Sequence, residues 1–120
     1  MPSVLIVEDS PAMRGLIASI VEQIEGCTVH EVDSGFEALK RLPGGAFDLI
    51  ITDINMPDIN GLELLSFIRK NPSYAETPVL IVTSEDSEAQ RKRGLALGAN
   101  AILSKPFEAG ELLSVVEGLL

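Results

Sequence analysis

Four short, uninterrupted apolar runs are the feature of this sequence that most restricts its fold. They cover residues 4–7, 49–51, 79–82 and 101–103, and none alternates apolar with polar side chains. Strands that are buried on both faces have this pattern, and such strands occur in parallel sheets covered by helices. The runs therefore predict central parallel strands, and the more polar residues 28–32 predict a fifth strand at a sheet edge.

Helix-length segments separate these strands. Apolar residues recur at helical spacing over residues 13–24 and 112–120, which predicts two amphipathic helices. Ser10, which precedes a proline, is a predicted N-cap, and Ser34, three residues ahead of a glutamate, predicts a capping box. Residues 84–94 have few apolar anchors, so their helix should pack loosely. The alternation of strands and helices predicts a doubly wound α/β sheet.

Length, charge and cysteine content describe one acidic domain. With 120 residues and 46% hydrophobic content, the chain can bury one core. Its net charge of −9 repels a phosphate backbone, so direct nucleic-acid binding is not expected. The single cysteine, Cys27, excludes an internal disulfide and predicts a reducing, cytoplasmic compartment. Without a long apolar run or the features of a signal peptide, neither membrane association nor export is expected.

Chemically reactive side chains follow four of the five predicted strands. Glu8 and Asp9 follow the first strand and Asp53 follows the third. Thr83 ends the fourth strand, and Lys105 follows the fifth. Ligands of open α/β sheets bind outside the carboxyl ends of the strands, so these side chains are expected to share one rim.

Three converging carboxylates cannot all stay ionised without a cation, and oxygen ligands favour Mg²⁺. Zinc is disfavoured, because Cys27 and His30 are too few and belong to the edge-strand segment. A carboxylate beside Mg²⁺ and an ammonium can attack phosphorus, which predicts an aspartyl phosphate on Asp53. Lys105 and the metal would spread the charge of the transferring group, and Thr83 could donate a hydroxyl to the product. Each residue alone also has a purely structural explanation, so the prediction depends on the set.

The ordered set of motifs resembles the response regulator receiver family over the whole chain. The motifs that carry the resemblance are Glu8-Asp9, Asp53-Ile54-Asn55-Met56-Pro57, Gly61, Thr83-Ser84 and Lys105-Pro106-Phe107. Each motif is weak alone, but together and in this order they are highly specific. The resemblance implies a single CheY-like receiver domain over residues 1–120, with flavodoxin-like strand order 2-1-3-4-5 and helices on both faces. It also implies a cis peptide bond before Pro106.

The same resemblance assigns roles in a two-component phosphorelay. Asp53 is the phosphoacceptor, and the donor is a phosphohistidine on a histidine kinase or phosphotransfer protein. Asp9 and Asp53 would ligate Mg²⁺ directly, while Lys105 would pair with the phosphoryl group. Glu8 would bind the metal through water and Asn55 through its backbone carbonyl. Glu8 stands where Asp is commoner, and coordination through water tolerates the extra methylene.

The resemblance further implies that phosphorylation remodels a partner-binding face built from the fourth helix, fifth strand and fifth helix. Family members often have Tyr or Phe three residues before the lysine, but this chain has Ile102, which lacks a polar tip. Ile102 is expected to stay largely buried in both states, while Thr83, Ser84 and the start of the fourth helix move. Asn55 and Glu85 would flank the phosphoryl group and leave room for water, which predicts unassisted dephosphorylation.

Three other functions fit these residues less well. A phosphohydrolase of the haloacid dehalogenase class needs a second aspartate as general acid, where Asn55 stands. A flavin carrier needs a hydroxyl-rich phosphate loop after the first strand, where Glu8 and Asp9 would repel phosphate. An inert scaffold would have lost an acid or the lysine. A phosphoryl switch, monomeric or weakly dimeric, is therefore expected rather than a turnover enzyme, and the sequence specifies neither its kinase nor its target.

Overall fold

A five-stranded parallel sheet forms the centre of the molecule. The computed structural model describes residues 1–85 and 87–120. The strands lie in the order β2-β1-β3-β4-β5, and every neighbouring pair is parallel. Their bounds are β1 (Ser3–Val7), β2 (Thr28–Val32), β3 (Leu49–Thr52), β4 (Val79–Thr83) and β5 (Ala101–Ser104). The doubly wound sheet and the strand order predicted above are confirmed.

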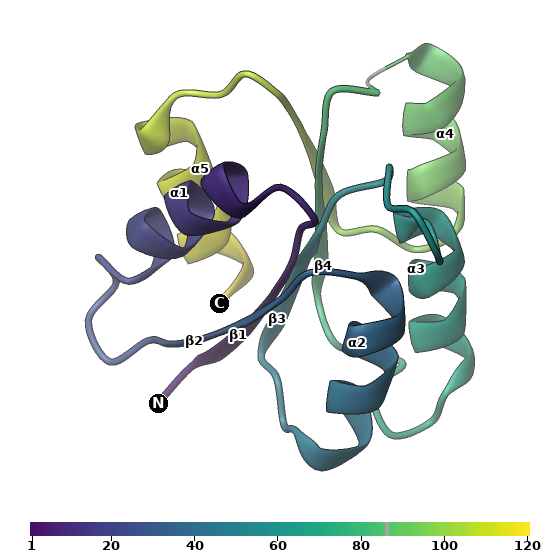
Figure 1. Cartoon of the computed structure of the whole chain (residues 1–120), viewed down its shortest axis with the longest axis horizontal. Helices are drawn as coiled ribbons and strands as arrows, with labels where there is room; N and C mark the ends of the chain where they lie inside the picture. Colours follow the sequence, from purple (N-terminus) through teal and green to yellow (C-terminus); the bar gives the residue numbers. More distant parts are fainter. Residues whose placement is uncertain (86) are drawn as a thin grey trace.

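Helices cover both faces of this sheet (Figure 1). One face carries α1 (Pro11–Val21) and α5 (Ala109–Leu119), and the other carries α2 (Gly35–Arg41), α3 (Gly61–Lys70) and α4 (Glu88–Ala96). A short 3₁₀ turn, η1 (Leu42–Gly44), follows α2. Each face buries its own apolar cluster against the sheet. In the described part of the chain, no helix combines the length and apolar character needed to cross a membrane.

Side chains predicted to begin helices do so in the structure. Ser10 and Ser34 each accept a hydrogen bond from the backbone N–H three residues ahead, at 3.3 and 3.1 Å. The Glu37 carboxylate pairs with Lys40, so the capping box predicted at α2 is present only on the Ser34 side. A complete capping box begins α3, where Asn60 is the N-cap. These caps determine where α1, α2 and α3 leave the rim that the strand ends form.

One prediction about the sheet is wrong, and it concerns β5. The apolar run at residues 101–103 predicts a central strand, whereas β5 lies at the sheet edge and all its residues are half-buried. Ile102 is half-buried within this strand, and its fixed position in both states stays a prediction. The covering helix, α4, buries only Gly94, as its polar composition predicts. Ile102 packs closely against this glycine: a Cβ added to Gly94 would lie 3.0 Å from Ile102 Cδ1.

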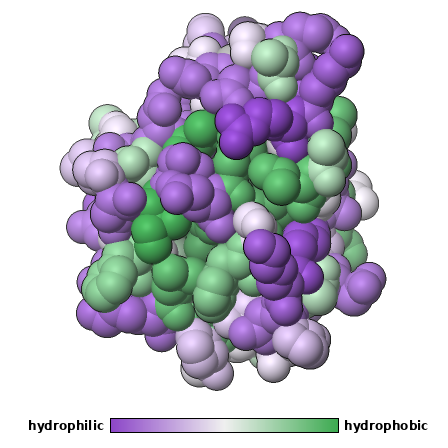
Figure 2. Space-filling view, turned by 90° about the vertical axis from the view of Figure 1, so that its right-hand side faces the viewer, coloured by the Kyte–Doolittle hydropathy of each residue, from purple (hydrophilic) through white to green (hydrophobic). Residues whose placement is uncertain are grey.

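Apolar side chains also remain exposed on the face that carries α2, α3 and α4. Phe36 is 56% exposed, Phe67 42% and Leu95 54%. Figure 2 shows apolar groups gathered between polar side chains on this side of the molecule. This face therefore has apolar surface available for contact with other molecules.

Arg69, near the end of α3, ties three segments together at the end of the sheet away from the strand carboxyl ends. Its guanidinium donates to the carbonyls of Gly98, Ala75 and Thr77 at 2.7 to 3.1 Å and to Asn100 Oδ1 at 2.9 Å. Gly98 has φ of +107°, and a Cβ there would lie 2.9 Å from Arg69 Nε. Both its conformation and the close approach of Arg69 require glycine.

Arg69→Ala is expected to destabilise the fold by about 1–3 kcal/mol, because several partly buried carbonyls lose their donors. Arg69→Lys should recover only part of this loss, since an ammonium cannot reproduce the planar fork of donors. Urea unfolding of the three proteins measures the effect. Equal stability of wild type and Arg69→Ala would contradict the role of this network.

Candidate functional site

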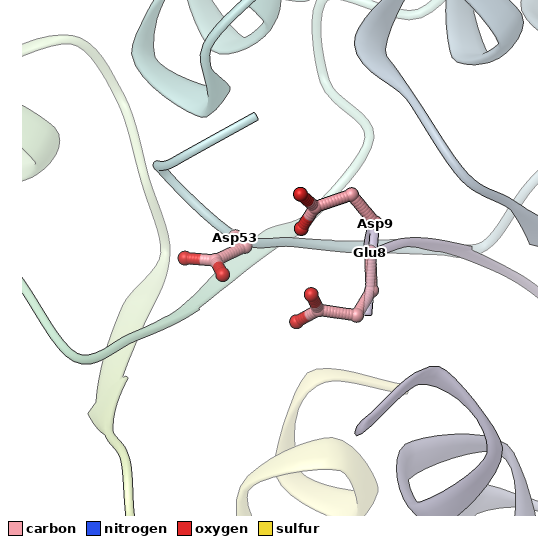
Figure 3. Close-up of side chains that lie close together, drawn as sticks. All are labelled: Glu8, Asp9 and Asp53. Atoms are coloured by element: carbon pink, nitrogen blue, oxygen red, sulfur yellow. The ribbon is translucent and has the colours of Figure 1, made fainter. Parts of the chain in front are cut away.

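Three carboxylates converge at the carboxyl end of the sheet (Figure 3). Glu8 and Asp9 directly follow β1, and Asp53 directly follows the adjacent strand β3. One carboxylate oxygen from each residue lies within 4.8 Å of the other two. Glu8 is 2% exposed and Asp53 8%, whereas Asp9 is open to solvent. The predicted convergence of these acids on one rim is confirmed, and the cluster could bind a metal ion.

Lys105 lies between two of the three acids. Its ammonium is 2.7 Å from Glu8 Oε1 and 2.8 Å from Asp53 Oδ2, and its side chain is only 15% exposed. The peptide bond between Lys105 and Pro106 is cis, as the resemblance implies. The backbone N–H of Lys105 donates to the Thr83 carbonyl at 2.9 Å, which holds the end of β5 beside β4. The lysine thus joins the ends of β1, β3 and β5.

Burial and hydrogen bonds determine how these groups titrate. Burial raises the pKa of Glu8, and the hydrogen bonds from Lys105 and from the Ser10 N–H offset this only in part. Burial also disfavours the charged form of Lys105, but the hydrogen bonds to Asp53 and Glu8 outweigh it, so the pKa of Lys105 is raised. Lys105 is therefore held as an ammonium, while Glu8 has a higher proton affinity than an exposed glutamate.

Backbone contacts fix the orientation of Asp53. Its Oδ1 accepts from the Ile54 N–H at 2.6 Å, and Lys105 holds Oδ2. Gly61, the first residue of α3, donates its N–H to the Ile54 carbonyl at 2.8 Å. A Cβ added to Gly61 would overlap the backbone carbonyl of Asp53. This close approach requires glycine, which explains why Gly61 belongs to the set of motifs described above.

The other predicted polar residues lie at the end of β4 and in the loop after β3. Thr83 is fully buried, and its hydroxyl oxygen accepts from the Glu85 N–H at 3.0 Å. Its hydroxyl hydrogen can therefore be donated to another acceptor. Ser84, Glu85 and Asn55 are exposed.

Arg14 contacts the site, although no sequence pattern predicted this role. Its guanidinium donates to the Glu8 carbonyl at 2.9 Å and lies 3.5 Å from the Glu31 carboxylate on β2. Arg14 therefore steadies the loop that carries Glu8 and Asp9. These residues have no regular spacing in the sequence, and only the pairing of β1 with β2 brings them together.

Asp9→Asn is expected to stabilise the metal-free protein by up to about 1 kcal/mol, because it removes one of three mutually repelling charges at an exposed position. The same change should reduce the stabilisation that added Mg²⁺ produces, since ligand binding stabilises by mass action. Thermal unfolding with a chelator and with Mg²⁺ measures both effects. Identical Mg²⁺-induced shifts in wild type and variant would contradict a shared site.

Comparisons with known proteins match almost the whole chain. The family model described as "Response regulator receiver domain" matches residues 4–117. Transcriptional regulatory protein TrcR of Mycobacterium tuberculosis is 37% identical over 117 residues, which are 98% of this chain and 44% of that protein. Chemotaxis protein CheY-3 of Vibrio cholerae is 35% identical over 109 residues, which are 91% of this chain and 84% of that protein.

The chain spans about half the length of TrcR and of the probable transcriptional regulator ycf29 of Pyropia yezoensis, of which it covers 44% and 51%. Among solved structures, chemotaxis response regulator CheY4 of Vibrio cholerae superposes with a TM-score of 0.92 at 35% identity, covering 100% of this chain and 99% of that one. The match of the family model, the strand order and the acidic rim agree with one another. The chain therefore belongs to the response regulator receiver family of two-component signalling.

Proposed function

We propose that the chain is a phosphoryl-accepting switch in which Asp53 receives the phosphoryl group of a phosphohistidine. The donor would be a histidine kinase or a phosphotransfer protein. The observation that carries this proposal is the ammonium of Lys105, 2.8 Å from Asp53 Oδ2, inside a cluster of converging carboxylates. A buried nucleophilic carboxylate beside a fixed cation suits transfer of a highly charged group.

Mg²⁺ is the cation that this set of ligands fits, because the cluster consists only of carboxylates. Asp9 and Asp53 would hold the ion directly, Glu8 through water and Asn55 through its backbone carbonyl. When bound, Mg²⁺ neutralises charge on the phosphoryl oxygens during transfer.

The transfer breaks the P–N bond of the donor and forms a P–O bond to Asp53. The donor imidazole, protonated on its other ring nitrogen, keeps the electron pair of the broken bond and leaves as the neutral ring. The Ile54 N–H, 2.6 Å from Asp53 Oδ1, holds the carboxylate plane while phosphorus approaches. Once Asp53 is an acyl phosphate its own charge is lost, and Lys105 pairs with the phosphoryl oxygens instead. Thr83 donates its hydroxyl hydrogen to one of them.

We infer a single phosphoryl acceptance followed by unassisted dephosphorylation rather than enzymatic turnover. A phosphohydrolase with an aspartate nucleophile needs a general acid, and Asn55, two residues after Asp53, has no carboxyl proton to donate. A steady-state phosphatase assay separates the two functions. Multiple rapid turnovers would identify a phosphohydrolase.

We place the output surface on α4, β5 and α5 of a single receiver domain, monomeric or weakly dimeric, in the cytoplasm. The half-buried edge strand β5 and the exposed Leu95 support this choice. Thr83 ends β4 and Ser84 follows it, ahead of α4, so a bond from Thr83 to the phosphoryl group would shift the start of that helix. Ile102 would remain packed against Gly94 in both states.

Asp53→Asn is expected to abolish phosphoryl acceptance, because the amide lacks the nucleophilic carboxylate. Wild type treated with acetyl phosphate and Mg²⁺ should gain the mass of one phosphoryl group, and the variant should not. Intact-protein mass spectrometry provides the measurement. A mass gain of the same size in Asp53→Asn would place the acceptor elsewhere.

Asn55→Arg and Glu85→Arg are expected to lengthen the lifetime of the acyl phosphate, because a bulky side chain beside it restricts the approach of water. Decay of the phosphorylated mass after removal of the donor measures the rate. Asp48→Ala, at the opposite end of the sheet, is the control and should decay as wild type does. An unchanged decay rate in both Arg variants would refute this steric explanation.

A further inference from the structure

Asp58 joins the loop after β3 to the first turn of α2. Its Oδ2 accepts from the Phe36 N–H at 3.1 Å, and its Oδ1 accepts from the Ile59 N–H at 2.7 Å. Hydrogen bonds from the backbone N–H groups, that of Ile59 foremost and those of Phe36 and Gly35 among the others, lower the pKa of Asp58. The carboxylate therefore bridges two segments that are far apart in the sequence.

A second contact, independent of the carboxylate, joins the same two segments. A Cβ added to Gly35 would lie 2.6 Å from the Ile59 carbonyl oxygen and 2.9 Å from Ile59 Cβ. The loop thus lies directly on the backbone of α2. This helix is itself well anchored, because Ala38 is fully buried and Leu42, which caps the C-terminal end of the helix, is 2% exposed. The loop after β3 therefore rests on a rigid support.

The loop has few buried side chains between its two ends. Asn55, Pro57 and Asp58 are exposed, and Met56 and Ile59 are half-buried. A segment with so little burial gains its fixed position from polar contacts with its surroundings. Asp58 supplies such contacts to α2, in the middle of the segment that carries Asn55.

We propose that Asp58 is a positioning residue for the metal site. By anchoring residues 55–59 to α2, it holds the Asn55 carbonyl in place relative to the carboxylate of Asp53. This inference rests on the proposed function, since that function makes Asn55 a metal ligand. Without Asp58 the loop must become ordered each time the cation binds, and this ordering weakens binding.

Calorimetric titration with Mg²⁺ alone tests the proposal in wild type, Asp58→Ala and Asp58→Asn. Asp58→Ala is expected to raise the Kd for Mg²⁺ about tenfold, the lower end of the effect of residues that orient metal ligands. Asp58→Asn should raise it less, because the amide oxygen still accepts a backbone N–H. Since Asp58 is exposed, both variants are expected to fold.

Asp48→Ala is the matched control. Asp48 also accepts a backbone N–H, that of Ser3 at 2.7 Å, but at the opposite end of the sheet. Its loss removes the same kind of bond and should leave the Kd for Mg²⁺ unchanged. Amide hydrogen exchange supplies a second readout. The N–H groups of Phe36 and Ile59 should exchange faster in Asp58→Ala than in wild type, and at the wild-type rate in Asp48→Ala.

A Kd of Asp58→Ala within about twofold of wild type would overturn the proposal, as would an equal rise in Asp48→Ala. Magnesium affinity is measured without phosphoryl transfer. Failure of wild type to accept a phosphoryl group would therefore refute the proposed function and leave this test intact. Conversely, a phosphorylated wild type with an unaffected Asp58→Ala would refute only the role of Asp58.

Discussion

The pairing of Lys105 with two buried carboxylates is the interaction on which the site depends. Glu8 and Asp53 are almost fully buried at adjacent strand ends, and buried charges are costly unless they are paired and hydrogen-bonded. One ammonium compensates part of this charge and leaves a residual negative potential beside Asp9. The same arrangement therefore joins the ends of three strands and leaves the rim with an acidic cluster that could hold a cation.

The parallel topology makes this pairing achievable. Glu8 and Lys105 are 97 residues apart, yet parallel strands all deliver their carboxyl ends to one rim. Close backbone contacts then refine the geometry. Gly61 lets α3 begin against the backbone of Asp53, and Gly35 lets the loop after β3 lie on α2. Side chains at the rim are thus positioned by the backbone of two helices as well as by the strands.

The helix α4 is held differently from the others. It buries only Gly94, which packs against Ile102, and the segment after it is tied to α3 by the bonds from Arg69 to the Gly98 carbonyl. Nearer its start, the Arg91 guanidinium donates to the Ile102 carbonyl of β5 at 3.3 Å. The helix is therefore held by a few contacts with β5 and by the bonds to the segment that follows it, rather than by a buried apolar face.

Local sequence patterns determined most of the fold and the chemical content of the site. Continuous apolar runs predict buried parallel strands, and reactive residues directly after such strands must reach the same rim. Each of these inferences needs only one strand and the residue that follows it. Strand order decided what these patterns could not. It placed residues 101–103 at an edge, and the tertiary fold brought Arg14 beside Glu31 and Asp58 against α2. Such contacts join residues with no regular spacing, so only the tertiary structure defines them.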